Sequence, residues 1–238
     1  MELNKLTNKK NVILTTRGNR AILQALRYAR TKHDTLYLAD QGDWITYEQY
    51  GKKLKFKIIE LKTKRGIINF DDVKKGVVLF NDMPAYAFMQ NKIKRKNDVL
   101  YIADITGSIG KRIPEADIIV CSFGKNKMIN LGYGGIIASD NDLNIFSDFD
   151  IAKMNLLNEK IENLPNRLKK LKEKREEIFK KIKFNVIGKE INILVKFKTE
   201  KEKEKIIEFC EDNKLDYKEC PMKIKVLEKA ISIEIQNS

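Results

Sequence analysis

Residues 117–139 contain the pattern that most constrains the fold: two short apolar runs separated by a loop rich in glycine and lysine. The runs occupy residues 118–121 and 136–138, and β-rich runs of this length are typical of strands buried in a parallel sheet. Four glycines in the loop allow close backbone approach, so we expect a ligand to lie against it. Partial burial there can lower the pKa of a lysine until the free amine attacks a carbonyl and forms a Schiff base. The alternative is a glycine-rich turn in which Lys125 and Lys127 are ordinary surface lysines.

The apolar pattern up to residue 139 predicts an α/β protein. Short β-rich runs alternate with polar turns, and a helical pattern with apolar residues at 22, 23, 26 and 29 follows the first run. This alternation predicts a large domain, residues 1–150, with a mostly parallel sheet and helices on both faces. The expected strands lie at residues 11–16, 35–39, 56–61, 76–80, 98–104, 118–121 and 136–138.

The pattern after residue 150 predicts a second, smaller domain, residues 151–238. A long, charge-rich helical pattern at 156–183, interrupted near Pro165, leads into it. The rest predicts a compact α+β unit, with strands at 191–197, 216–219 and 231–235 and a helix at 200–213.

Composition limits the class of protein. A chain of 238 residues with 42% apolar residues can bury a good core, and its length fits one domain or a large and a small one. No stretch approaches the roughly 18 to 20 apolar residues of a membrane span, and the first residues lack the apolar core of a signal peptide. We therefore expect a cytoplasmic protein with no membrane partner. The three cysteines lack metal-type spacing, so we expect no metal site.

The formal net charge of +14 comes mostly from lysine. Lysine-rich surfaces attract polyanions, which raises the hypothesis of a nucleic-acid partner. The lysines, however, are spread along the chain and interleaved with glutamate, with no arginine-rich segment and no aromatic platform. This distribution favours a solvated, thermally adapted surface over a nucleic-acid site.

Three segments place polar groups where α/β sheets bind ligands. Asp104 ends an expected strand, and the carboxyl ends of parallel strands are where ligands are contacted. Gly18, Asn19 and Arg20 open an expected helix, whose N-terminus attracts anions, although an ordinary capped helix fits the same residues. The polar loop at 81–86 follows a buried strand and is expected to form a wall of the site.

Several short motifs follow one another in a defined order. They are Asp104, Gly110, Ser122-Phe123, Lys127 and Gly132-Tyr133-Gly134-Gly135. This order resembles the pyridoxal-phosphate-dependent enzymes of the aspartate aminotransferase superfamily (fold type I), and most of all the DegT-type sugar aminotransferases. In that family a strand ends in Asp, a Gly follows six residues later, and Ser-Phe, a lysine and a Gly-x-Gly-Gly turn come next. The likeness covers nearly the whole chain.

The resemblance implies a pyridoxal 5′-phosphate cofactor and a role for each matching residue. Asp104 would pair with the pyridinium nitrogen, Lys127 would form the internal aldimine (a Schiff base) and move protons, and Ser122 would bind the phosphate. Lys125 is the alternative Schiff-base lysine, because its spacing from Ser122 fits other branches of the superfamily.

The resemblance also assigns residues in the first part of the chain. Gly18, Asn19 and Arg20 lie where the family cradles the cofactor phosphate. Trp44, the only tryptophan, is the candidate to stack on the cofactor ring, and Tyr47 is close enough to compete for that role.

Three departures from the family pattern bear on activity. The residue three positions after the ring-binding aspartate is usually Gln or His, and here it is Gly107. The arginine that usually holds a substrate carboxylate is absent from residues 228–232, where Lys229 offers charge without the bidentate fork. The chain is also shorter than typical members.

These features predict a pyridoxal-phosphate-dependent aminotransferase that acts on a small-molecule amino donor and acceptor. The family forms its sites at subunit interfaces, so the resemblance also implies a homodimer. The alternative is a catalytically degenerate member that keeps the fold as a binding or regulatory scaffold, a hypothesis motivated by Gly107 and the absent arginine.

Overall fold

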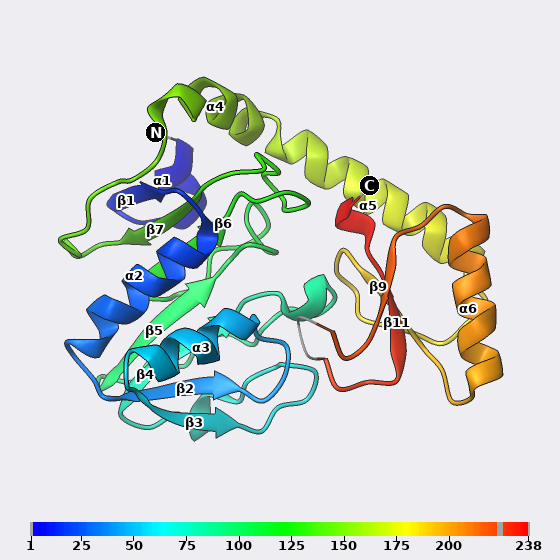
Figure 1. Ribbon diagram of the computed structural model, residues 1–238, viewed down its shortest axis with the longest axis horizontal. Coiled ribbons are helices and arrows are strands. Elements are labelled where there is room, and N and C mark those ends of the chain that lie inside the picture. Colours follow the sequence, from blue (N-terminus) through cyan, green and yellow to red (C-terminus); the bar gives the residue numbers. More distant parts are fainter. Residues whose placement is uncertain (1, 223–225, 238) are drawn as a thin grey trace.

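The computed structural model describes residues 2–222 and 226–237 and contains two sheets (Figure 1). The larger sheet has seven strands in the order β1-β7-β6-β5-β4-β2-β3. All the strands expected before residue 140 are present. Their bounds are β1 Asn11–Thr15, β2 Thr35–Ala39, β3 Lys57–Leu61, β4 Gly76–Asn81, β5 Val99–Asp104, β6 Ile118–Ser122 and β7 Gly135–Ser139.

The larger sheet is mostly parallel, as predicted. Strands β3, β2, β4, β5 and β6 run parallel to one another, whereas β7 is antiparallel to both β6 and β1. The expectation that the run at 136–138 belongs to the parallel part is therefore wrong. The chain leaves β6 through a loop without a crossover helix and turns straight back, which an antiparallel neighbour permits and a parallel one does not.

Two helices cover one face of this sheet, and Figure 1 shows both in front of it. They are α2 (Gly18–Arg30) and α3 (Ile45–Lys53). The apolar positions of α2 fall on one side at helical spacing and are buried against the sheet. Its buried side chains are Ala21, Ile22, Ala25, Leu26 and Ala29.

The opposite face is packed by α1 (Glu2–Thr7), by irregular segments and by the helices that follow the sheet. The crossovers from β4 to β5 and from β5 to β6 contain no α-helix, only the short 3₁₀ turn η2 (Pro84–Tyr86). Another such turn, η1 (Phe70–Asp72), precedes β4 and packs Phe70 edge-on against Phe80. The helices that flank the sheet confirm the α/β class.

The C-terminal unit, residues 151–237, begins with an interrupted helix, as predicted. After η3 (Ile151–Lys153), helix α4 (Met154–Glu162) ends where α5 (Leu164–Lys181) starts, with Pro165 in the first turn of α5, where its missing N–H leaves no helical bond unmade. Four antiparallel strands, in the order β10-β11-β9-β8, then pack with helix α6. The bounds are β8 Val186–Ile187, β9 Ile193–Lys196, α6 Glu200–Asp212, β10 Tyr217–Glu219, β11 Ala230–Ile233 and the turn η4 Ile235–Asn237.

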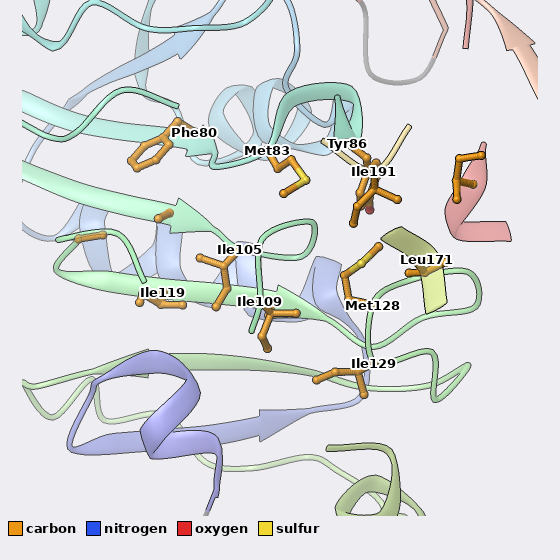
Figure 2. Close-up of a cluster of buried hydrophobic side chains, with 14 of the residues drawn as sticks. Phe80, Met83, Tyr86, Ile105, Ile109, Ile119, Met128, Ile129, Leu171 and Ile191 are labelled. Atoms are coloured by element: carbon orange, nitrogen blue, oxygen red, sulfur yellow. The ribbon is translucent and has the colours of Figure 1, made fainter. Parts of the chain in front are cut away.

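One apolar cluster joins the two parts of the chain. In Figure 2, Ile105 and Ile109 from the loop after β5 lie in the same cluster as Met128 and Ile129, and Leu171 of α5 reaches it as well. The C-terminal unit thus shares its core with the larger sheet. The domain boundary at residues 150–151 stays a prediction.

Across residues 2–222 and 226–237, no helix has the length and apolar character needed to cross a membrane.

Candidate active site

Asp104 ends β5 as a buried carboxylate, with only 8% of its surface exposed. The Tyr47 hydroxyl donates to one carboxylate oxygen at 2.7 Å, and the backbone N–H of Thr106 donates to the other at 2.9 Å, with the Thr106 hydroxyl as a third donor. Burial and the nearby negative charge of Asp104 raise the pKa of Tyr47 well above its ordinary value, so this hydroxyl stays protonated and keeps donating. A carboxylate can accept about four hydrogen bonds, so Asp104 can still accept one from a ligand.

Ser122 lies beside Asp104, at the end of β6. Its backbone N–H donates to the Thr106 hydroxyl at 2.9 Å, so Thr106 links the two strand ends. The N-terminus of α2 presses against the same point, because a Cβ on Gly18 would lie 2.4 Å from the Ser122 Cβ. No side chain of the described residues caps this helix end. A helix N-terminus next to a serine hydroxyl is a site for an anion.

The loop after β6 holds Lys127 at the pocket. Met128 and Ile129 are buried in the cluster of Figure 2 and anchor the backbone that follows the lysine. The Lys127 Nζ donates to the Tyr86 hydroxyl at 3.0 Å and lies 5.5 Å from the centre of the Trp44 ring. Lys125 is exposed and does not line the pocket that Asp104 and Ser122 share. Of the two candidate lysines, Lys127 is the half-buried one and the one that lines the pocket with Asp104 and Ser122.

The pKa of Lys127 differs from the expectation from sequence. Burial lowers it, but the interaction with Tyr86 and the negative charges of Asp104 and Glu234 outweigh burial, so the pKa lies above the ordinary value for lysine. The expectation that partial desolvation lowers this pKa is wrong for the protein without ligand. The reason is that an acceptor and two carboxylates surround the ammonium group.

Tyr86 is a site residue whose individual role the sequence did not indicate, although the loop at 81–86 was expected to form a wall. Ala85 and Tyr86 both have positive φ, at 54° and 56°, a strained backbone that is typical of functional sites. Gly107 makes this arrangement possible, because a Cβ there would lie 3.0 Å from the Tyr86 ring. The tyrosine thus packs against the place where the family carries a Gln or His side chain. The Tyr86 ring, from the loop after β4, therefore occupies space that a side chain at position 107 would need.

Of the other predicted residues, Trp44 lies at the pocket, whereas Tyr47 and Arg20 do not offer their side chains to a ligand there. Trp44 is half-buried at the pocket, and its ring N–H donates to the Asn19 side chain at 3.2 Å, so helix α2 and the start of α3 meet there. Tyr47 is fully buried and holds Asp104 instead of offering its ring to a ligand. Arg20 is not brought to the pocket, because its guanidinium pairs with Asp148 at 3.1 Å.

Two adjoining cavities meet at Lys127. The smaller, of about 110 Å³, lies at the strand ends, and the larger, of about 310 Å³, lies between the sheet and the C-terminal unit. Trp44, Tyr86 and Lys127 line both. The larger cavity is walled on the C-terminal side by Ser232, Glu234 and Gln236, among others, and no arginine occurs among the described residues that line it. A small molecule in the larger cavity would therefore reach the same amine as a group in the smaller one.

The fold defined by these elements is that of the pyridoxal-phosphate-dependent enzymes of fold type I. The GDP-4-keto-6-deoxy-D-mannose-3-dehydratase of E. coli, solved with bound hydrated PLP, superposes with a TM-score of 0.73 at 12% identity, over 98% of this chain and 85% of that one. An aspartate aminotransferase of Thermus thermophilus gives 0.71 at 12% identity, over 99% and 82%. 3-Amino-5-hydroxybenzoic acid synthase gives 0.67 at 13% identity, over 99% and 83%.

At these identities the likeness establishes the fold, in agreement with the resemblance seen in the sequence motifs. No family model and no curated protein sequence matches the chain.

A buried acid next to the site has an unusual titration. Asp43 accepts the backbone N–H groups of Ala39 and Asn81 at 2.9 and 3.1 Å. Burial, reinforced by the charges of Asp104 and Asp40, raises its pKa from 3.8 to about 7. Between pH 3.8 and about pH 7, the Asp43 carboxyl is therefore protonated in the folded protein and ionised in the unfolded chain.

We predict that stability falls as pH rises through this window and that Asp43→Asn reduces the fall. The folded pKa lies above the unfolded one, so ionising Asp43 disfavours the folded state, by up to about 4 kcal/mol across the whole window. Urea unfolding at intervals from pH 4.5 to 7.5 measures the slope of the free energy of unfolding against pH. The exposed carboxylate variant Asp98→Asn is the control, and equal slopes for Asp43→Asn and the unmodified protein would contradict the prediction.

Proposed function

We propose that the protein is a pyridoxal-phosphate-dependent aminotransferase that transfers an amino group between small molecules, with Lys127 as its cofactor lysine. The observation that carries this proposal is the position of the Lys127 Nζ. It lies where a pocket containing a buried carboxylate and an anion site joins a larger cavity open to substrate.

The residues of the smaller pocket fit the polar groups of the cofactor. Asp104 has one acceptor position left for a protonated ring nitrogen, and its negative charge favours the protonated form. The N-terminus of α2 at Gly18 and Asn19, together with the Ser122 hydroxyl, suits the phosphate. Trp44 offers an aromatic face for the ring between these two ends.

Bound pyridoxal phosphate supplies an electron sink for a carbanion at the amino-bearing carbon of the donor. The residues of the chain then have three tasks. Lys127 anchors the cofactor, and its Nζ accepts and returns the proton at that carbon. Tyr86 holds the Nζ by its hydroxyl, and Asp104 maintains the charge on the ring nitrogen.

A second candidate is a non-catalytic scaffold with the same fold. The observation that favours it is the lack of an arginine among the described residues that line the larger cavity, because a substrate carboxylate then has no bidentate partner. Amino-group transfer by any donor would exclude this alternative.

We further propose that the protein acts as a homodimer. Phe146 and Ile151 are 93% and 84% exposed, which is unusual for large apolar side chains so close together in the sequence. Asp148, between them, accepts the backbone N–H of Thr16 and pairs with Arg20, which places this segment next to the anion end of the pocket. A second copy that covers these residues would lie beside the cofactor site.

The first prediction concerns the cofactor lysine. Mixing the protein with pyridoxal phosphate and then borohydride should fix a label on Lys127, detected by peptide mapping. Lys127→Ala should reduce the label at this site to background, because the attacking amine is gone, whereas Lys125→Ala should keep it within about twofold.

The fluorescence of Trp44 reports cofactor binding that does not depend on covalent attachment, and it serves as the control. Trp44 is the only tryptophan and lines both cavities, so cofactor in the pocket should quench its fluorescence. Lys127→Ala should keep a reversible quench while losing the label. A label that persists at the same loop in Lys127→Ala would assign the role to Lys125.

The second prediction concerns amino-group transfer. Incubation of the loaded protein with an amino donor should convert bound pyridoxal phosphate to pyridoxamine phosphate, followed by absorbance and by chromatography of the released cofactor. Asp104→Asn should slow this conversion by about two orders of magnitude, because the neutral amide no longer favours a charged ring nitrogen. If Lys127 takes the label in the borohydride experiment, but folded protein loaded with unreduced cofactor converts none of a broad panel of donors, the scaffold is supported instead.

The third prediction concerns assembly. Phe146→Glu combined with Ile151→Glu should shift the protein from dimer to monomer in analytical ultracentrifugation, because two buried charges disfavour an apolar contact. Leu227→Glu, at a residue 60% exposed on the C-terminal unit, is the matched control and should leave the dimer intact. A monomeric unmodified protein would overturn this proposal.

A further inference from the structure

The C-terminal wall of the larger cavity holds a buried carboxylate, Glu234, which follows β11 and is 7% exposed. Its oxygens accept hydrogen bonds from four side chains. The Ser232 hydroxyl and the Gln236 amide donate at 2.7 Å each, and the Asn192 amide and the Lys218 ammonium donate at 3.3 Å each. All four acceptor positions of the carboxylate are therefore used.

Lys218 differs from the other three donors. The residues Ser232, Gln236 and Asn192 are at most 6% exposed, whereas the Lys218 side chain is 44% exposed and itself lines the cavity. Its contact with Glu234 is also among the longer ones. An exposed lysine at 3.3 Å gains little from such a pair, so another ammonium group can take its place at low cost.

The same wall disfavours a substrate carboxylate. A carboxylate that approached Lys218 would also approach the buried charge of Glu234, and like charges repel strongly where water is excluded. The positive charge of Lys218 is already compensated by Glu234, and no arginine occurs among the described residues lining the cavity.

The other charged residues of the cavity do not reverse this preference. Lys127 is committed to the cofactor, Lys125 is exposed, and Glu219 is an exposed residue that pairs with Lys203 at 2.7 Å. Glu234 is the only buried charged group among the described residues that line the cavity.

We propose that the cavity binds an amino donor that carries a second ammonium group, and that Lys218 occupies the position of this group at Glu234 until the donor displaces it. The inference rests on the proposed function, because the first amino group of the donor is the one that would react at the cofactor. Binding of the second ammonium depends on Glu234 alone and can be measured without turnover.

The test uses three ligands of equal length that differ at one end: 1,5-diaminopentane, 5-amino-1-pentanol and 5-aminopentanoate. Calorimetric titration at neutral pH is done on the protein as purified and on protein whose Lys127 has been fixed to pyridoxal phosphate by borohydride, which prevents turnover. We expect the diamine to bind most tightly and the amino alcohol next, because each can place an ammonium group at Glu234, and the amino acid to bind most weakly, because its carboxylate adds repulsion.

Variants separate this role from a general charge effect. Glu234→Gln should weaken diamine binding about tenfold, whereas Glu219→Gln, which removes a carboxylate from the same cavity, should change it by less than about twofold. Lys218→Met should tighten diamine binding by about threefold or more, because the competing ammonium is absent. Melting temperatures of the variants show whether the fold is kept.

The sign of the Lys218 effect decides the outcome. Tightest binding of 5-aminopentanoate, with loss of binding in Lys218→Met, would overturn the proposal and make Lys218 a carboxylate ligand. Unchanged diamine binding in Glu234→Gln would overturn it as well. Absence of a label on Lys127 would contradict the proposed function, yet the titrations of unlabelled protein would still test the role of Glu234.

Discussion

The structure depends on compensating one buried negative charge at the end of β5. An isolated carboxylate in this position would be too costly to bury, so the fold supplies donors from several elements. Helix α3 contributes the Tyr47 hydroxyl, and the turn after β5 contributes the backbone and side chain of Thr106. The Thr106 hydroxyl in turn accepts a hydrogen bond from the backbone N–H of Ser122. Satisfying Asp104 thus fixes the positions of β6, α3 and the pocket between them.

Much of the fold and the centre of the site could be predicted from the sequence. The strands of the larger sheet are short apolar runs bounded by polar turns, so their positions follow from the local sequence pattern. Asp104, Ser122 and Lys127 were predicted to lie close together because each ends or follows such a strand, and the carboxyl ends of parallel strands gather at one edge. Their roles came from the family resemblance and stay predictions. The interruption of the long helix was marked by Pro165, which has no N–H to donate.

The rest depends on contacts between distant residues. Tyr86 reaches Lys127 because two residues adopt positive φ and because Gly107 leaves room, and neither condition is visible in a local pattern. Arg20 turns away from the pocket because Asp148, 128 positions later, offers it a charged partner. The direction of β7 has no signature in its apolar residues, and the sign of the pKa shift at Lys127 is set by groups from other elements.

The apolar cluster shared by the sheet and the C-terminal unit also sets the mechanical behaviour of the protein. Leu171 and Ile191 of the C-terminal unit pack with Met128, next to Lys127, so rotating this unit away from the sheet would expose the cluster to water. Large hinge motions are therefore costly. The two cavities beside Lys127 therefore already exist in the protein without ligand, and the buried Met128 holds the backbone that follows the lysine.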